Sequence, residues 1–551
     1  MSEPERRLAP GELYLVAANS YANQKENGFQ QRQDRPPWPL ELPLDWRADP
    51  HNDNNWNIQL HSWRMIDPIL REWFREPSPR LVQEMLAFAR DWHAFHCERV
   101  CENSWYDMAA GIRALRIAFF FERDRCDEGD FTDEDRQLLV SLYRQHSTYL
   151  MDDANWGTSN HALFQAMGNR VMHRQAGALA DDVPYMAASG ELMLKCLKSL
   201  FTDEGIEKEH SAGYHFFVTD VMDRCSIAEN FPEIAEVLQI IELAKRNRAW
   251  LYFPDGTVSR VGDTLGQYDV SPAEVPAIEG ARSWRSDGRE LLIGDFSRSG
   301  WVIVKSAAGT PLDRQSMLFF TAMSHGYGHK QADDLSFQLF EGGRHVLVDS
   351  GQYALSPYDE MKLYVAGAAS HNTVDLGDAP MSRRDTPLYG SGLNPVRADR
   401  KAIVMSGEIL DRGRAFSHLR RLKYRPGRDL EVVDFLEVNN GKKAELCSRL
   451  HFAPDLEVRA ETNGFSARVE GQAIARIVPP SGWSVELVFG REKPPLGWVT
   501  VGYRSVKPIF VIEARKTVAT ATAKWRIRFR GERLDGEEAE ATPANEVVAT
   551  R

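Results

Sequence analysis

Residues 325–353 read HGYGHKQADDLSFQLFEGGRHVLVDSGQY and join a glycine-rich loop to two short alternating segments. Leu335, Phe337 and Leu339 alternate with polar neighbours, which is typical of a half-buried strand. His325 and His329 lie on the preceding loop, where glycines let another backbone or a ligand approach closely. We expect the strand to be a rigid support that holds the histidines toward a substrate. The alternative is that the loop is only a turn.

The same period-two pattern continues on both sides of this stretch, from Trp301 to about residue 531. Segments such as WVIVKSA, SMLFFTAM, HLRRLKYR, LEVVDFLEV and KWRIRFRG are short, alternating and separated by turn residues. Several short strands with regular turn signals predict an antiparallel β-sandwich.

The residues before about position 255 have a different period. Segments such as SPRLVQEMLAFARDWHAFHCERV and FPEIAEVLQIIELAKRNRAWLYF repeat apolar residues three and four apart. TDEDRQLLVSLYRQHSTYL begins with Thr132 as an N-cap and acidic residues in its first turn. Helices of this length with short connections predict stacked antiparallel helical hairpins.

Helices therefore come first and strands second, which predicts a multidomain chain of helical and then β architecture. The predicted parts are an irregular, ordered N-terminal segment at 1–60, a helical domain at 61–290, a β-sandwich at 291–533 and a flexible acidic tail at 534–551.

The composition excludes several classes of protein. The 551 residues carry a formal net charge of −12, so no basic footprint for nucleic acid is present, and an acidic substrate would need a local basic site. No apolar run is long enough to span a membrane, and the first residues do not form a secretory signal. The six cysteines form no CxxC pair. These features predict a cytoplasmic location, or a periplasmic or cell-envelope one if a leader is missing.

Two polar clusters lie in the helical part. Asn160 and His161 follow Thr158 and Ser159, which we expect to cap a helix, so the pair would sit in a first turn that favours an anion. Further along, EKEHSAGYHFF spaces two other polar residues four apart, on one helical face. These are His210 and Tyr214. The alternatives are helix-start residues with local hydrogen bonds, and a core tyrosine beside a surface histidine.

Together, the NH pair, EHSxxYH, HxQxDxLSF, DSGQY and HNTV resemble the heparinase II/III-like polysaccharide lyases, in the correct order over most of residues 150–375. The resemblance implies an incomplete (α/α) toroid followed by an antiparallel β-sandwich. It implies β-elimination in an acidic polysaccharide or oligosaccharide such as heparan sulfate, alginate or hyaluronan. In that reaction the uronate carboxylate is neutralised, a base removes the C5 proton, and O4 departs to leave an unsaturated uronate.

The resemblance also assigns residues. Asn160 and His161 match the pair that neutralises the carboxylate, Tyr214 matches the tyrosine that acts as acid or as both acid and base, and His329 matches the first histidine of the sandwich motif. The expected substrate-binding residues are His210, Trp105, Trp156, Tyr353 and Tyr364.

Two of the family's metal-ligand positions are Asp349 and His371, but Gln331 stands where some members have a ligand histidine. Glutamine is a poor zinc ligand beside histidine and carboxylate. The sequence leaves open a structural zinc or a hydrogen-bonded Gln–Asp–His set. The chemistry requires no cofactor.

Three other functions use similar residues. A uronyl C5-epimerase removes the same proton and returns it from the opposite face. A non-catalytic glycan-binding protein could stack sugars on Trp105, Tyr106 and Trp156. An inverting glycoside hydrolase would need two facing carboxylates, and those available are Glu207, Glu209 and Asp333.

Overall fold

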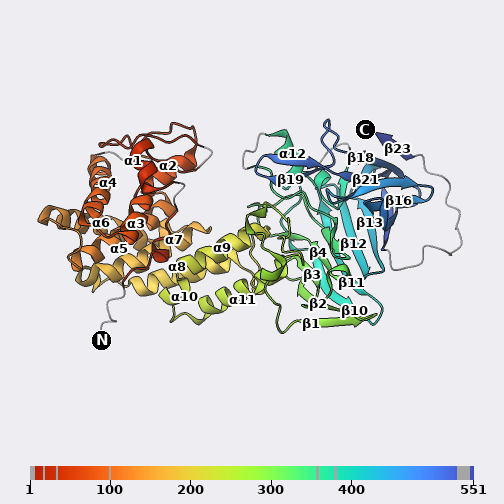
Figure 1. The fold of residues 1–551 in the computed structure, drawn as a ribbon, viewed down its shortest axis with the longest axis horizontal. Helices are drawn as coiled ribbons and strands as arrows, with labels where there is room; N and C mark the ends of the chain where they lie inside the picture. The colour runs from red at the N-terminus through yellow and green to blue at the C-terminus, as the bar shows by residue number, and fades with distance from the viewer. Residues whose placement is uncertain are drawn as a thin grey trace. The chain divides into compact units, whose positions relative to one another are not determined.

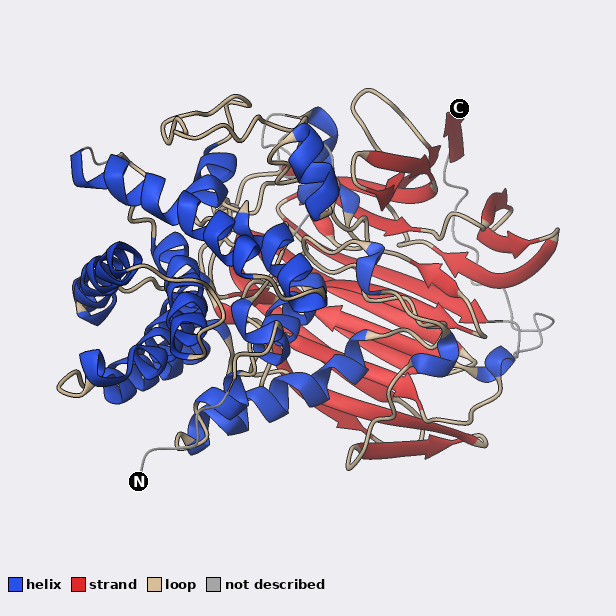
Figure 2. Cartoon of the chain, turned by 60° about the vertical axis from the view of Figure 1, so that its left-hand side comes forward, coloured by secondary structure: helices blue, strands red, loops and turns tan. Residues whose placement is uncertain are grey.

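The computed structural model describes residues 7–16, 19–32, 35–98, 101–354, 359–377, 381–529 and 547–550. It divides into two compact units: residues 1–200 with 218–242, and residues 201–217 with 243–551. Helices dominate the first and strands the second (Figure 1 and Figure 2). The predicted order of helices and then strands is confirmed. Most of the predicted tail at 534–551 lies outside the described residues.

The first unit is built from helices that follow the predicted periodic segments. Two further helices, α9 and α11, run from one unit into the other. The α-helices up to the start of the sheets are α1 Tyr21–Asn27, α2 Asn54–His61, α3 Ile66–Arg75, α4 Pro79–Glu98, α5 Asp107–Arg125, α6 Asp133–Met151, α7 His161–Ala176, α8 Tyr185–Leu200, α9 Ala212–Arg224, α10 Ile227–Asn230 and α11 Ala235–Leu251. Among the residues that the structure describes, no helix is long and apolar enough to cross a membrane.

Local sequence explains the helix ends and contacts. Thr132 caps α6 as predicted, in a reciprocal box with Asp135. Helices α5 and α7 meet backbone to backbone at two glycines, since a Cβ on Gly111 would lie 2.3 Å from the Phe164 carbonyl oxygen and one on Gly168 would lie 2.3 Å from the Gly111 oxygen. Only glycine permits so close an approach.

The second unit contains three large sheets and two strand pairs, and their ladders are antiparallel except for β18 with β23. The six-stranded sheet, in spatial order, is β1 Arg282–Ser286, β2 Arg289–Phe296, β3 Trp301–Ser306, β4 Ser316–Thr321, β6 Ser336–Glu341 and β7 His345–Leu347. The eight-stranded sheet is β10 Leu393–Ala398, β11 Ile403–Arg412, β12 Phe416–Arg425, β13 Asp429–Val438, β22 Thr520–Phe529, β17 Gln472–Val478, β16 Gly464–Val469 and β15 Glu457–Glu461. The five-stranded sheet is β23 Val547–Thr550, β18 Ser484–Phe489, β21 Phe510–Val518, β14 Ala444–His451 and β8 Val374–Leu376.

Shorter elements complete this unit. The strand pairs are β19 Trp498–Gly502 with β20 Ser505–Pro508, and β5 Met323–Ser324 with β9 Gly390–Ser391. Helix α12, Glu360–Ala366, is N-capped by Asp359, which accepts from the backbone N–H groups of Met361 and Lys362.

A buried ion pair ties the sheets to the loops around the site. Arg420 on β12 lies opposite Asp434 on β13 and donates to its two carboxylate oxygens at 2.6 and 2.9 Å. The same guanidinium donates to the carbonyl oxygens of Leu335, which precedes β6, and of Asn372, which follows His371. A charge inside the core thus sets the position of two backbone segments.

Replacing Asp434 by Asn should lower the free energy of unfolding of the second unit by roughly 3–5 kcal/mol, because Arg420 would be left buried without its counter-charge. Denaturant unfolding followed by tryptophan fluorescence measures this. Glu437→Gln, at an exposed position of the same strand, should change the free energy by less than about 0.5 kcal/mol. Equal losses in the two variants would contradict the assignment.

Candidate active site

His210 fixes the loop at 325–329. Its Nδ1–H donates to the Gly328 carbonyl oxygen at 2.9 Å, and its Nε2 accepts from the His325 backbone N–H at 2.9 Å. Burial and the nearby Lys330 charge lower its pKa to about 3, so the ring stays neutral. The prediction that His210 and Tyr214 share a helical face is wrong, because α9 begins at Ala212 and His210 precedes it.

His329 takes the strained conformation in this loop. Its φ is 51°, in the left-handed region that few residues other than glycine adopt, and neither Gly326 nor Gly328 has a positive φ. Gly262 makes room for it, since a Cβ there would lie 2.3 Å from the His210 oxygen and 3.0 Å from the His329 oxygen. Such strain persists only where the surroundings hold it.

Carboxylates face both nitrogens of the His329 ring. Nδ1 lies 3.5 Å from Asp263 Oδ2, and Nε2 lies 3.9 Å from Glu209 Oε2. The Asp263 backbone N–H also donates to the His329 carbonyl oxygen at 3.2 Å. An Asp facing Nδ1 favours the tautomer that leaves Nε2 as the basic atom.

Tyr214, in the first turn of α9, stacks on His329. The ring centroids are 3.4 Å apart and the planes differ by 19°. Burial raises the Tyr214 pKa, and the charges of Asp263, Glu209 and Glu207 raise it further. The hydroxyl is therefore a protonated donor at neutral pH. The structure thus brings together two of the predicted catalytic residues inside one unit.

Asp263 is the charged centre of this group and was not predicted. Lys362 Nζ lies 2.7 Å from its Oδ1, and Gln331 Nε2 donates to the same oxygen at 2.9 Å. Burial alone would raise the pKa of this carboxyl, but the hydrogen bond from His329 and the charge and hydrogen bond of Lys362 outweigh burial and lower it. Asp263 is therefore ionised. Its sequence context, VGDTLG, reads only as a turn.

Glu207 is a second buried acid close to Tyr214. Its Oε2 accepts from the Glu209 backbone N–H at 2.9 Å, and its Oε1 has no hydrogen-bond partner within the described part of the chain. Burial raises its pKa well above the usual range, with a further contribution from Glu209. Glu207 is thus a neutral acid.

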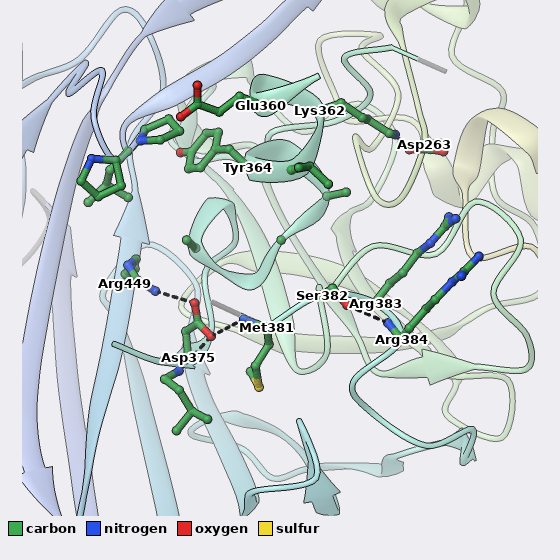
Figure 3. Close-up of a pocket in the computed structure, with 18 of the residues that line it drawn as sticks. Asp263, Glu360, Lys362, Tyr364, Asp375, Met381, Ser382, Arg383, Arg384 and Arg449 are labelled. Carbon is green, nitrogen blue, oxygen red and sulfur yellow. Dashed lines mark hydrogen bonds and ion pairs between the residues drawn. The ribbon is translucent and has the colours of Figure 1, made fainter. Parts of the chain in front are cut away.

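A pocket of about 850 Å³ opens beside His329 and Lys362 (Figure 3). Tyr364 lines it, but its hydroxyl accepts from the backbone N–H groups of Gly497 and Trp498, and burial raises its pKa to about 12. Tyr353 packs in the same apolar group as Tyr364. The volume suits a short oligosaccharide.

Asn160 and His161 belong to the first unit. Asn160 is itself the N-cap residue of α7 and makes no side-chain cap bond. The predicted capping by Thr158 and Ser159 is thus wrong in register, although Ser159 Oγ does accept from the His161 N–H at 3.3 Å. Asp107 Oδ1 lies 3.2 Å from His161 Nδ1 and orients the ring.

The two predicted sugar-stacking tryptophans are half-buried in the first unit. Trp105 stacks on Tyr149 at 4.9 Å, and its indole N–H donates to His96 Nε2. The Trp156 indole N–H donates to the Leu150 carbonyl oxygen at 3.1 Å. Both indole N–H groups are thus bonded within the protein.

Comparison with known proteins gives the family. A family model described as heparinase II/III N-terminus matches residues 15–269, and one described as heparinase II/III-like, C-terminal, matches residues 289–534. The chain belongs to the heparinase II/III-like family. The resemblance inferred from the motifs is confirmed.

Individual relatives of this heparinase II/III-like chain are distant in sequence. A heparin-sulfate lyase of Bacteroides stercoris is 21% identical over 389 residues, which cover 62% of this chain and 57% of that protein. The chain thus spans less than two thirds of that relative. Among solved structures, a heparinase III with methylated lysines has a TM-score of 0.71 at 16% identity, covering 94% of this chain and 85% of its own. A heparan sulfate lyase of Pedobacter heparinus has a TM-score of 0.67 at 15% identity, covering 94% and 83%. The predicted toroid and sandwich architecture is confirmed.

The metal position of some family members is altered in this chain. His371 Nδ1 lies 2.9 Å from Asp349 Oδ2, so these two residues already bond to each other. Gln331 turns its amide nitrogen to Asp263 and to the Gly351 carbonyl oxygen. Among the described residues, no group of three or more His, Cys, Asp or Glu could hold a metal ion. The residues present do not fit a zinc site.

We expect His210 to stay neutral, with its proton on Nδ1, from pH 8 down to about pH 4, because its pKa is about 3. Since this pKa lies below that of an unfolded histidine, about 6.5, His210 contributes stability that is lost as the pH falls below about 6.5. Nitrogen-15 NMR of histidine-labelled protein measures the tautomer, and a His210→Gln spectrum assigns the signal. Protonation near pH 6 would contradict the loop contacts.

Gln331→His should create a zinc site, because a histidine nitrogen would join the Asp349 carboxylate and the His371 ring as a third ligand. Metal analysis after dialysis is expected to find about one zinc per chain in the variant and much less in the unmodified protein. A full equivalent of zinc in the unmodified protein would show that Gln331 does not prevent binding.

Proposed function

We propose that this protein is a lyase that cleaves uronate glycosidic bonds by β-elimination. The stacked Tyr214–His329 pair beside an ionised Asp263 carries this proposal. β-Elimination needs one group to take the C5 proton and one to protonate the departing O4, on neighbouring carbon atoms. Two rings in contact supply two such groups at short range.

The electrostatics support the following division of the two roles. His329 Nε2 takes the C5 proton, and Asp263 stabilises the resulting imidazolium from the Nδ1 side. The C5–H electron pair forms the C4–C5 double bond, and the C4–O4 bond breaks. Tyr214, held as a phenol by its raised pKa, gives its proton to O4. Water then takes the proton from the imidazolium and returns one to the phenolate, which resets the pair.

In this proposal Asn160 and His161 neutralise the carboxylate of the substrate uronate. Their positions match the family's Asn-His pair, and Asp107 holds the His161 ring. Neutralising the uronate carboxylate stabilises the enolate-like intermediate that forms when C5 loses its proton.

The proposed substrate is a uronate-containing acidic polysaccharide or oligosaccharide, with glycosaminoglycans as the first class to test. The names heparin-sulfate lyase and heparan sulfate lyase, borne by relatives, support this choice.

Tyr214→Phe should lower the turnover rate roughly 100- to 10,000-fold, since the variant loses the proton donor but keeps the ring that stacks on His329. The measurement is ultraviolet absorbance of the unsaturated uronate, on a panel of heparan sulfate, hyaluronan and alginate oligosaccharides. Tyr503→Phe, at an exposed tyrosine, is the matched control and should retain full activity.

Two results would refute the lyase assignment. Solvent deuterium at C5 without any unsaturated product would identify an epimerase. Binding of an oligosaccharide without exchange or cleavage would identify a glycan-binding protein.

A further inference from the structure

The pocket beside His329 has a basic wall. Its cationic lining residues are Lys362, Arg383, Arg384, Arg449, Arg491 and Arg515. Its acidic lining residues are Asp263, Glu360 and Asp375. The protein as a whole carries a formal charge of −12, so the sign of this wall is opposite to the net charge of the chain.

Most of these cations are neutralised by carboxylates. Lys362 pairs with Asp263 at 2.7 Å, and Arg491 lies 3.5 Å from Glu486. The remaining pairs are Arg449 with Asp375 and Glu513, and Arg515 with Glu513 and Glu445. Arg383 and Arg384, by contrast, make no ion pair with any residue that the structure describes.

The chain holds these two arginines in place through their backbone. The Ser382 N–H donates to Asp385 Oδ2 at 2.6 Å, and the Arg384 N–H donates to Ser382 Oγ at 3.3 Å. Half-buried Arg383 also places Nη1 3.4 Å from the carbonyl oxygen of Lys330, the residue after His329. In the view of Figure 3 both guanidinium groups extend on the side of Lys362 and Asp263.

We propose that Arg383 and Arg384 bind a second anionic group of the substrate, a sulfate ester or a carboxylate, on a sugar next to the uronate that is cleaved. This inference rests on the proposed lyase function. A guanidinium offers a planar fork of donors that fits either oxyanion. Arg383 and Arg384, which pair with no carboxylate of the described residues, gain most from an incoming anion.

The location in the pocket explains why the anion belongs to a neighbouring sugar. His329 lines the same pocket and would act at C5 of the cleaved uronate. The carboxylate of that uronate is assigned to Asn160 and His161. The arginines are thus left to select chains with a further negative charge, so that they determine specificity and take no part in the chemical step.

Three trisaccharides of equal length test this. The first has one uronate and no sulfate, the second adds one O-sulfate, and the third consists of uronates only. KM and kcat are measured for the unmodified protein, for Arg383→Ala/Arg384→Ala, and for the charge-conserving Arg383→Lys/Arg384→Lys. Arg421→Ala, at an exposed arginine of β12 outside the pocket, controls for loss of charge in general.

The double alanine variant should raise KM about 10- to 100-fold for trisaccharides with the second anion, as expected for lost charge-assisted hydrogen bonds. KM for the first trisaccharide, and kcat for all three, should change less than about twofold, and the lysine variant should recover part of the loss. An effect limited to the second trisaccharide identifies sulfate, and an effect limited to the third identifies carboxylate. No change in KM, or an equal rise for all three, would overturn the inference.

If the lyase proposal is wrong, the result differs from the one that would overturn the arginine site. The unmodified protein would then produce no unsaturated uronate from any trisaccharide. Calorimetric titration with the same trisaccharides still decides the arginine site: weaker binding of the second or third in the double alanine variant supports it, and unchanged or uniformly weakened binding overturns it.

Discussion

The buried carboxylate of Asp263 is the constraint on which the site depends. A buried carboxylate is stable only when cations and hydrogen-bond donors surround it. Here the donors come from two separate segments: His329 and Gln331 in the loop before β6, and Lys362 on α12. The interactions that stabilise the Asp263 carboxylate therefore also fix the position of His329, which lines the pocket. The strained backbone of His329 is held on its other side by His210 and Gly262.

This arrangement also accounts for Gln331. A histidine there could not supply the two amide N–H bonds that Gln331 gives to Asp263 and to the Gly351 carbonyl oxygen. His371 and Asp349, which belong to the metal positions of some relatives, bond to each other instead. In this chain Gln331 supports the loop through its bonds to Asp263 and to the Gly351 carbonyl oxygen.

The sequence predicted those features that depend on local pattern. Periodicity located the long helices, the Thr132 cap marked the start of α6, and the motifs identified Tyr214 and His329. The burial of Glu513 on β21 could not be predicted, because it depends on ion pairs with Arg449, opposite on β14, and with Arg515. Asp263 and the two hydrogen bonds by which His210 holds the loop at 325–329 were missed for the same reason. Their roles depend on partners that are distant in sequence, so no local sequence pattern predicts these roles.

The two residues of the proposed acid–base pair lie within one compact unit. Tyr214 lies in the part of α9 that belongs to the second unit, together with His329 and Asp263, whereas Asn160 and His161 belong to the first. The raised pKa of Tyr214 is therefore set before any substrate binds, by burial and by Asp263 and Glu209. The charges that hold His329 in place also keep Tyr214 protonated. A phenol held in this form can donate to O4 but is a poor base, and this is why the histidine rather than the tyrosine receives the C5 proton in the mechanism proposed above.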